Sequence, residues 1–219
     1  MNQKTAISKI NAHGALLVFP LNNNKEPKSL WSEFFPKSKL RLEWDEGADN
    51  RVSNLWYLMK KLSDCRQVVY SKWYQGRATF FSRELFVALL SLAQKEVHTE
   101  VRLSRPAKEI LDTLESDSPL STKQLKKMTE LQGKDNQATY NRAMKELFSK
   151  FYIVAYGEVD DGAFPSLAIG ATSVLYEDLW NEATALTLAT AKSTVKTYMH
   201  DESLFYKFLK RVFNKGVDS

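Results

Sequence analysis

Cysteine is almost absent from this chain of 219 residues, since Cys65 is the only one. An internal disulfide is therefore excluded, which fits a reducing compartment, and we expect a cytoplasmic protein. The three histidines, His13, His98 and His200, are far apart and lack the spacing of metal ligands, so we expect no zinc or other metal site. A glycine-rich phosphate-binding loop is also missing, and we expect no cofactor.

Long apolar runs are missing as well. No stretch approaches the ~18 apolar residues of a membrane span, and the N-terminus lacks the apolar core of a signal peptide, so we expect no membrane association. With 8 glycines and 6 prolines, the composition does not predict long disorder. The chain is 43% hydrophobic and 12% aromatic, which is enough to bury a core. We expect an α+β fold that is mainly helical.

The most informative pattern spans residues 105–180. Three helix signals begin at residues 105, 121 and about 137, and two strand-like runs follow them. Asp160-Asp161-Gly162 lies between those runs and is a strong hairpin signal. Three helices followed by a β-hairpin is the order of a winged helix-turn-helix, which commonly places its third helix in the DNA major groove.

Local signals support these helices. Pro106 suits a first helical turn, and Ser121 or Thr122 can cap the second helix. In that second helix we expect Leu125 and Met128 to face inward. The third helix places its polar side chains on or near the face opposite its apolar stripe: Gln137, Thr139, Arg142, Lys145, Glu146, Ser149 and Lys150.

The first hundred residues predict a second, smaller module. Two strand-like runs around Gln75-Gly76 form a β-hairpin over residues 67–81, with a helix signal on each side. Such a unit can pack as a second winged-helix-like layer, in tandem with the first. We therefore expect three parts: an N-terminal α/β module (1–103), a winged-helix domain (104–180) and C-terminal helices packed on the body (181–219).

Charge is unevenly distributed, although the formal net charge is only +5. Lysine and arginine outnumber acids in residues 121–150, whereas residues 151–191 hold acids and no basic residue. Phosphate binding needs the first pattern, and the acidic hairpin argues against a wing that lies along a phosphate backbone. We predict DNA contacts from this group of side chains: Lys123, Lys126, Lys127, Lys134, Gln137, Thr139, Arg142 and Lys145. A purely structural or protein-binding module is the alternative.

Residues 70–77 interleave aromatic and basic side chains around a glycine turn. Strand alternation would place the two tyrosines and Lys72 on one face, and stacking on unpaired bases uses such a mixture. The alternative that we favour is burial of Trp73, because a tryptophan is costly to leave exposed. Lys72 and Arg77 are the candidates for DNA contact near this turn.

Four segments carry a resemblance to a known family: Trp44-Asp45, Leu55-Trp56, residues 72–82 and Glu177-Asp178-Leu179-Trp180. They look like a group of short bacterial proteins described as AlkZ-related. That group is similar to the winged-helix DNA glycosylases that unhook interstrand crosslinks. The resemblance implies tandem winged-helix modules and a DNA-related role.

The resemblance also implies where catalysis would be found. The glycosylases carry a Gln-x-Gln pair that positions water at the sugar. The nearest string here is Leu-Gln-Gly-Lys-Asp at residues 131–135, in which Lys134 stands at the second glutamine position. Only Gln132 corresponds, so it is the single catalytic candidate. The chain is also much shorter than those enzymes, and both departures argue against base excision.

Three hypotheses follow. The first is a non-catalytic DNA-binding protein linked to repair or regulation. The second is a divergent DNA glycosylase acting on alkylated or crosslinked bases. The third is a winged-helix scaffold for protein assembly, which would have no affinity for DNA.

Overall fold

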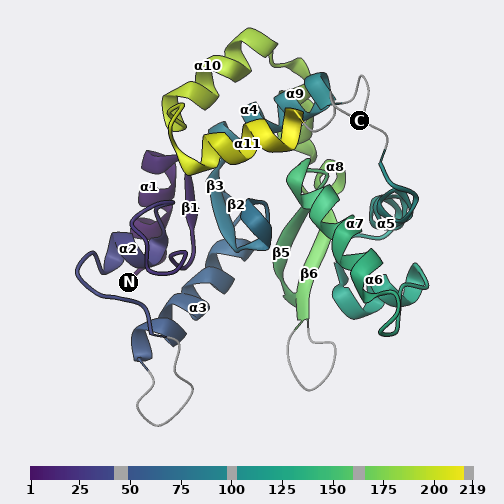
Figure 1. Ribbon diagram of the computed structural model, residues 1–219, viewed down its shortest axis with the longest axis horizontal. Coiled ribbons are helices and arrows are strands. Elements are labelled where there is room, and N and C mark those ends of the chain that lie inside the picture. Colours follow the sequence, from purple (N-terminus) through teal and green to yellow (C-terminus); the bar gives the residue numbers. More distant parts are fainter. Residues whose placement is uncertain (42–48, 98–102, 160–165, 215–219) are drawn as a thin grey trace.

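The computed structural model describes residues 1–41, 49–97, 103–159 and 166–214. Its strands are β1 (Ala15–Leu17), β2 (Val68–Ser71), β3 (Thr79–Ser82), β4 (Leu120–Ser121), β5 (Ile153–Val159) and β6 (Ser166–Ala171). They form one antiparallel sheet in the order β1-β3-β2-β5-β6-β4. Figure 1 labels β1, β2, β3, β5 and β6 of this sheet. The expected α+β, mainly helical fold is confirmed. The turn signal at residues 160–162 lies outside the described residues.

Helices pack on both faces of this sheet. One face carries α1 (Gln3–His13), α2 (Leu30–Phe34), α3 (Asn50–Asp64), α5 (Arg105–Ser116), α6 (Thr122–Met128) and α7 (Gln137–Ser149). The other carries α4 (Arg83–Leu92), its π-helical extension η2 (Ala93–Val97), α9 (Glu177–Ala185), α10 (Leu188–Tyr198) and α11 (Leu204–Asn214). The short elements are the 3₁₀ turn η1 (Tyr74–Gly76) and the helix α8 (Thr172–Leu175). None of the described helices is long and apolar enough to cross a membrane.

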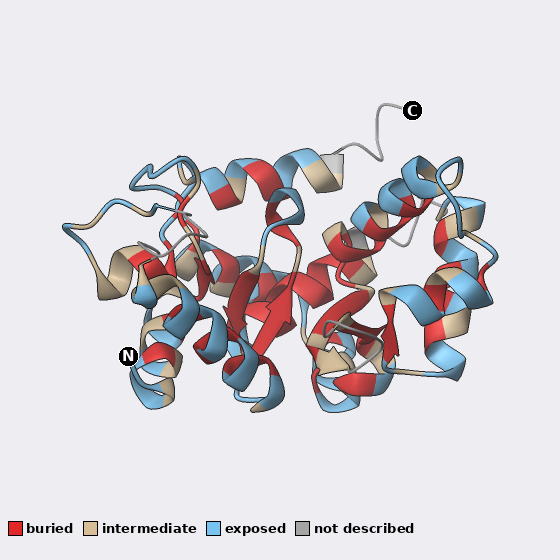
Figure 2. Cartoon of the chain, turned by 90° about the horizontal axis from the view of Figure 1, so that it is seen from below, coloured by how far each residue is buried: buried red, intermediate tan, exposed pale blue. Residues whose placement is uncertain are grey.

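Both faces of the central strands are buried, as the red strands between blue-edged helices in Figure 2 show. Successive side chains in a strand point to opposite faces. Tyr70 and Phe80 therefore stack on each other in the core under α1–α3, while Val69 and Phe81 belong to the core under α4 and α11. The sheet is thus the middle layer of three.

The two halves of the sheet share one order of elements. The first half runs helix, strand, helix, helix, strand, strand through α1-β1-α2-α3-β2-β3, and the second repeats this through α5-β4-α6-α7-β5-β6. In each half the first strand pairs with the third and the third pairs with the second. The two second strands, β2 and β5, pair with each other at the centre, with Tyr70 opposite Ala155. Counted inward from either edge of the sheet, the order is therefore the same: first strand, third strand and second strand of that half.

The boundary expected between residues 103 and 104 has no counterpart in the sheet, which continues from one half to the other through β2 and β5. The division into three domains stays a prediction. The last helix, α11, packs Phe205 and Phe208 against Trp73, so the C-terminal region covers the junction between the halves.

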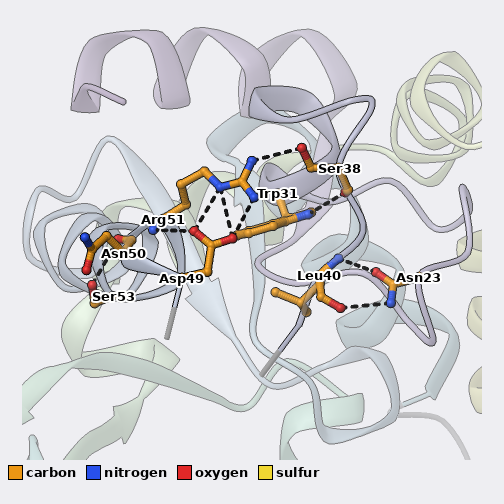
Figure 3. A network of polar contacts seen from close by, with 8 residues as sticks. All are labelled: Asn23, Trp31, Ser38, Leu40, Asp49, Asn50, Arg51 and Ser53. Carbon is orange, nitrogen blue, oxygen red and sulfur yellow. Dashed lines mark hydrogen bonds and ion pairs between the residues drawn. The ribbon is translucent and has the colours of Figure 1, made fainter. Parts of the chain in front are cut away.

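Asp49 fixes the start of α3 (Figure 3). Its carboxylate accepts hydrogen bonds from the backbone N–H and the guanidinium of Arg51. These bonds, above all the side-chain bond, lower the pKa of Asp49. The same guanidinium lies over the rings of Trp31 and Phe35 and donates to Ser38. This contact ties the start of α3 to α2.

Some expected orientations are wrong. Met128 is 51% exposed rather than inward, because α6 ends there and Thr129, one turn after Leu125, is the buried residue. Lys150 is buried rather than on the polar face of α7, and its ammonium group pairs with Glu146 at 2.9 Å. Trp56, on α3, is 50% exposed although it is a large aromatic residue.

Trp73 gives a test of the packing that joins the halves. Its ring is 1% exposed and lies against Phe81, Phe151 and Phe208. Trp73→Ala should lower the free energy of unfolding by about 3–5 kcal/mol, because it leaves a cavity among these rings. The half-exposed Trp56 is the matched control, and Trp56→Ala should change stability by less than about 0.5 kcal/mol in urea denaturation. Equal losses for both variants would contradict this account of the core.

Candidate nucleic-acid interface

The pair α6 and α7 presents polar side chains on a helical surface. Ser121 caps α6 through a capping box, in which its hydroxyl accepts from the Gln124 N–H and the Gln124 side chain accepts from the Ser121 N–H. Gly133 adopts a positive φ of 86° in the connection, a conformation that favours glycine. Asn136 then precedes α7 and donates to the carbonyl of Gln132.

Arg142 and Lys145 are exposed on α7, and no other part of the described chain covers them. Gln137 and Asn141 are exposed on the same helix. The helix therefore turns polar and cationic groups outward while its apolar stripe, including Met144 and Leu147, is buried. The positively charged side chains that the sequence predicts on this helix are therefore accessible to solvent.

A groove of about 500 Å³ separates this helical pair from the connection between β2 and β3. Its polar lining comes from three places: Lys72, Gln75 and Gly76 in the connection, Thr122 and Lys126 in α6, and Gln137, Tyr140, Asn141 and Lys145 in α7. Its apolar lining comes from α7 and β6: Met144, Phe148, Leu167 and Ile169. We call this site the α7 groove. Among the described residues that line it, none is acidic.

Lys72 reaches the α7 groove because β2 ends one residue before it. Gln75 then takes a left-handed conformation, with φ 53° and ψ 30°, and turns the chain through η1. The side chain of Lys72 is half-buried, and this loss of hydration lowers the pKa of its ammonium group. Lys72 is thus a cation placed in a partly dry environment.

A short hydrogen-bonded chain organises the rim of the groove. Lys126 Nζ donates to Gln137 Oε1 at 2.7 Å, and Gln137 Nε2 donates to Asn141 Oδ1 at 2.7 Å. Lys126 Nζ also lies 4.7 Å from the centroid of the Tyr140 ring, a cation–π contact. These contacts fix the direction of the amide groups and hold one cation over the groove.

Within the described part of the chain, the hydroxyl of Tyr140 has no hydrogen-bond partner, although the residue is only 5% exposed. Burial raises the pKa of Tyr140, so the group stays a neutral hydroxyl that can donate and accept. An unsatisfied buried hydroxyl costs about 1–3 kcal/mol. Tyr140 therefore lines the groove and carries a buried hydroxyl that no described protein atom satisfies.

The structure brings together some of the sequence-predicted residues and not others. Four of them line the α7 groove: Lys72, Lys126, Gln137 and Lys145. The others lie outside its lining, either exposed or, for Thr139, half-buried: Arg77, Lys123, Lys127, Lys134, Thr139 and Arg142. Gln132 is exposed in the connection between α6 and α7, and it is not part of the groove.

The base-stacking interpretation of residues 70–77 is wrong. Tyr70, Trp73 and Tyr74 are all buried, and they face different cores rather than one open strand face. The strand alternation fails because β2 stops at Ser71 and the chain enters η1. The favoured alternative, burial of Trp73, is confirmed.

Sequence reasoning missed Tyr140, Asn141 and Gln75 as groove residues. Asn141 lies four residues after Gln137 and four before Lys145, so helical spacing alone was a usable signal for it. Tyr140 looked like a core residue because it belongs to the apolar stripe. No cluster of metal-ligating side chains occurs among the residues that the structure describes.

Comparison with protein families gives one match. The family model described as AlkZ related matches residues 1–207. Comparisons with curated proteins and with solved structures gave no match.

The unsatisfied hydroxyl predicts an unusual stability effect. Tyr140→Phe removes a group without a partner and leaves the buried ring in place, so stability should be unchanged or rise by up to about 1 kcal/mol. Tyr198→Phe is the matched control, since its hydroxyl donates to Glu84 at 2.6 Å, and stability should fall slightly. Urea denaturation of both variants measures this. A clear loss of stability for Tyr140→Phe would show that the hydroxyl is satisfied in solution.

Proposed function

The chain belongs to the AlkZ-related family, and we propose that it binds double-stranded DNA through α6 and α7 without catalysing a reaction on it. The observation that carries this proposal is the open cationic surface formed by α7, together with the groove beside it, whose described lining holds no acidic residue. The family supports a link to DNA repair, because AlkZ-related proteins resemble crosslink-unhooking glycosylases.

The order of elements supports a winged-helix arrangement. The sequence α5-β4-α6-α7-β5-β6, with β4 paired to β6, corresponds to a helix-turn-helix followed by a hairpin and a three-stranded sheet. The repeat of this order in α1-β1-α2-α3-β2-β3 supports a second module in tandem. In this proposal α7 is the recognition helix.

The proposed contacts divide into two kinds. Gln137, Arg142 and Lys145 on α7 are placed to reach base edges or the nearest backbone. The phosphate contacts come from the flanking cations Lys123, Lys126, Lys127, Lys134, Lys72 and Arg77, and from the hydroxyl of Thr139. Strand β5 contributes no phosphate contact in this proposal, because its Glu158 carboxylate is negative and pairs with Lys60 at 3.5 Å.

A catalytic role has less support. Gln132 is exposed, Lys134 occupies the second position of the glycosylase signature, and none of the described groove residues is a carboxylate that could serve as a general base. Because the chain belongs to the AlkZ-related family, a divergent glycosylase is the second candidate function.

Salt dependence tests the DNA contacts. The double variant Arg142→Ala/Lys145→Ala should weaken duplex binding and reduce the slope of log affinity against log salt by up to about 2, since each lost phosphate contact removes about 0.9. Lys25→Ala/Lys28→Ala, on exposed residues between β1 and α2 at the other end of the sheet, is the charge-matched control. Fluorescence anisotropy in rising salt measures both. Equal slopes for the two double variants would remove α7 from the interface, and a wild type without DNA affinity would favour a protein scaffold.

A base-release assay on alkylated and crosslinked duplexes separates the binding protein from the glycosylase. We expect no more release with the wild type than with Gln132→Ala, because the position of the second glutamine is held by Lys134. Release by the wild type that disappears in Gln132→Ala would establish the glycosylase instead.

A further inference from the structure

We infer that the α7 groove holds one unpaired nucleotide of the bound DNA, with its base between the apolar walls and its phosphate at the lysine rim. This inference rests on the proposed function and adds to it a preferred form of DNA. A base within an intact stack cannot enter a side pocket, so the groove selects nucleotides that are bulged or otherwise extruded from the duplex.

The walls of the groove suit a flat ring. Its volume of about 500 Å³ lies in the range of sites for small organic ligands, about 300–1,000 Å³. Met144 and Phe148 line it from α7, while Leu167 and Ile169 line it from β6. Apolar side chains on two elements can enclose the faces of a base, as pockets for extruded bases do.

The edge of a base would meet polar groups that the protein leaves available. Tyr140 lines the groove, and its hydroxyl is buried and has no hydrogen-bond partner among the described residues, so a base edge that reaches this hydroxyl would remove an existing cost. The amides of Gln75 and Asn141 lie in the same lining. Amides and hydroxyls carry both donors and acceptors, which matches the mixed edges of nucleobases.

The cations of the rim suit the phosphate of the same nucleotide. Lys72, Lys126 and Lys145 come from three different elements and line one groove, and none of its described lining residues is acidic. A free phosphate would use these lysines but leave the apolar walls unused. An apolar peptide would use the walls but leave the cations unused. A nucleotide uses both.

Duplexes that differ at one position test this inference. Fluorescence anisotropy measures the affinity of the full chain for three duplexes. They are a fully paired duplex, the same duplex with one bulged 2-aminopurine nucleotide, and the same duplex with a bulged abasic residue. The wild type should bind the 2-aminopurine bulge about tenfold more tightly than the other two, since enclosing one base contributes about that much. The fluorescence of 2-aminopurine should also change on binding.

Two groove variants and one control complete the experiment. Tyr140→Phe and Lys72→Met should each reduce the preference for the bulged 2-aminopurine duplex over the paired duplex several-fold. Tyr206→Phe, on α11 across the sheet, should behave as the wild type.

Each other result overturns a stated claim. Equal affinity for paired and bulged duplexes would overturn the nucleotide site while leaving the proposed function intact. An equal preference for the abasic bulge would show that the protein senses a bend rather than a base. A preference that survives in both groove variants would place the base elsewhere. Absence of binding to all three duplexes would overturn the proposed function itself.

Discussion

The pairing of β2 with β5 is the constraint on which the rest of the molecule depends. It joins two like sets of elements into one sheet, with Tyr70 opposite Ala155. Just beyond this pairing, Trp73 stacks on Phe151 at a centroid distance of 5.6 Å and anchors the connection between β2 and β3 to the second half. The same connection carries Lys72 to α7. The groove therefore exists because the two halves are held edge to edge.

Local structure was largely predictable from the sequence, because its causes are local. Pro106 and Ser121 mark helix starts within a residue of where they occur, and the buried strands follow from their apolar side chains. The groove was not predictable in the same way. Lys72 and Lys145 are remote in sequence. The apolar residues of β2 and β5 predict that both strands are buried, but they do not predict that the two strands pair with each other.

The errors at single residues have a common cause. Periodicity assumes that an element continues, and it fails where the element stops. The chain leaves β2 after Ser71, so the tyrosines on either side of Lys72 point into separate cores. The helix α6 ends at Met128, so its side chain is left outside the core. Tyr140 shows a different limit of periodicity, since a residue on the apolar stripe also lines the groove and carries a buried hydroxyl without a partner among the described residues.

The ion pair between Lys60 and Glu158 lies at the position in the repeat that corresponds to the α7 groove. This ion pair joins α3 to β5, which belong to different halves. In the repeated order of elements α3 corresponds to α7 and β5 corresponds to β2, so the α7 groove, between α7 and the β2–β3 connection, is the counterpart of this site. In the α3–β5 site the Glu158 carboxylate neutralises the lysine, and Gly157 allows β5 to approach Asp64 so closely that a Cβ at this position would clash with the Asp64 carboxylate. At the other, the lysines meet no acid in the described lining. The two halves thus share an order of elements but differ in charge at these two sites. Among the described residues, a long anionic ligand lying across both would meet unneutralised lysines at the α7 groove and a neutralised lysine at the α3–β5 site.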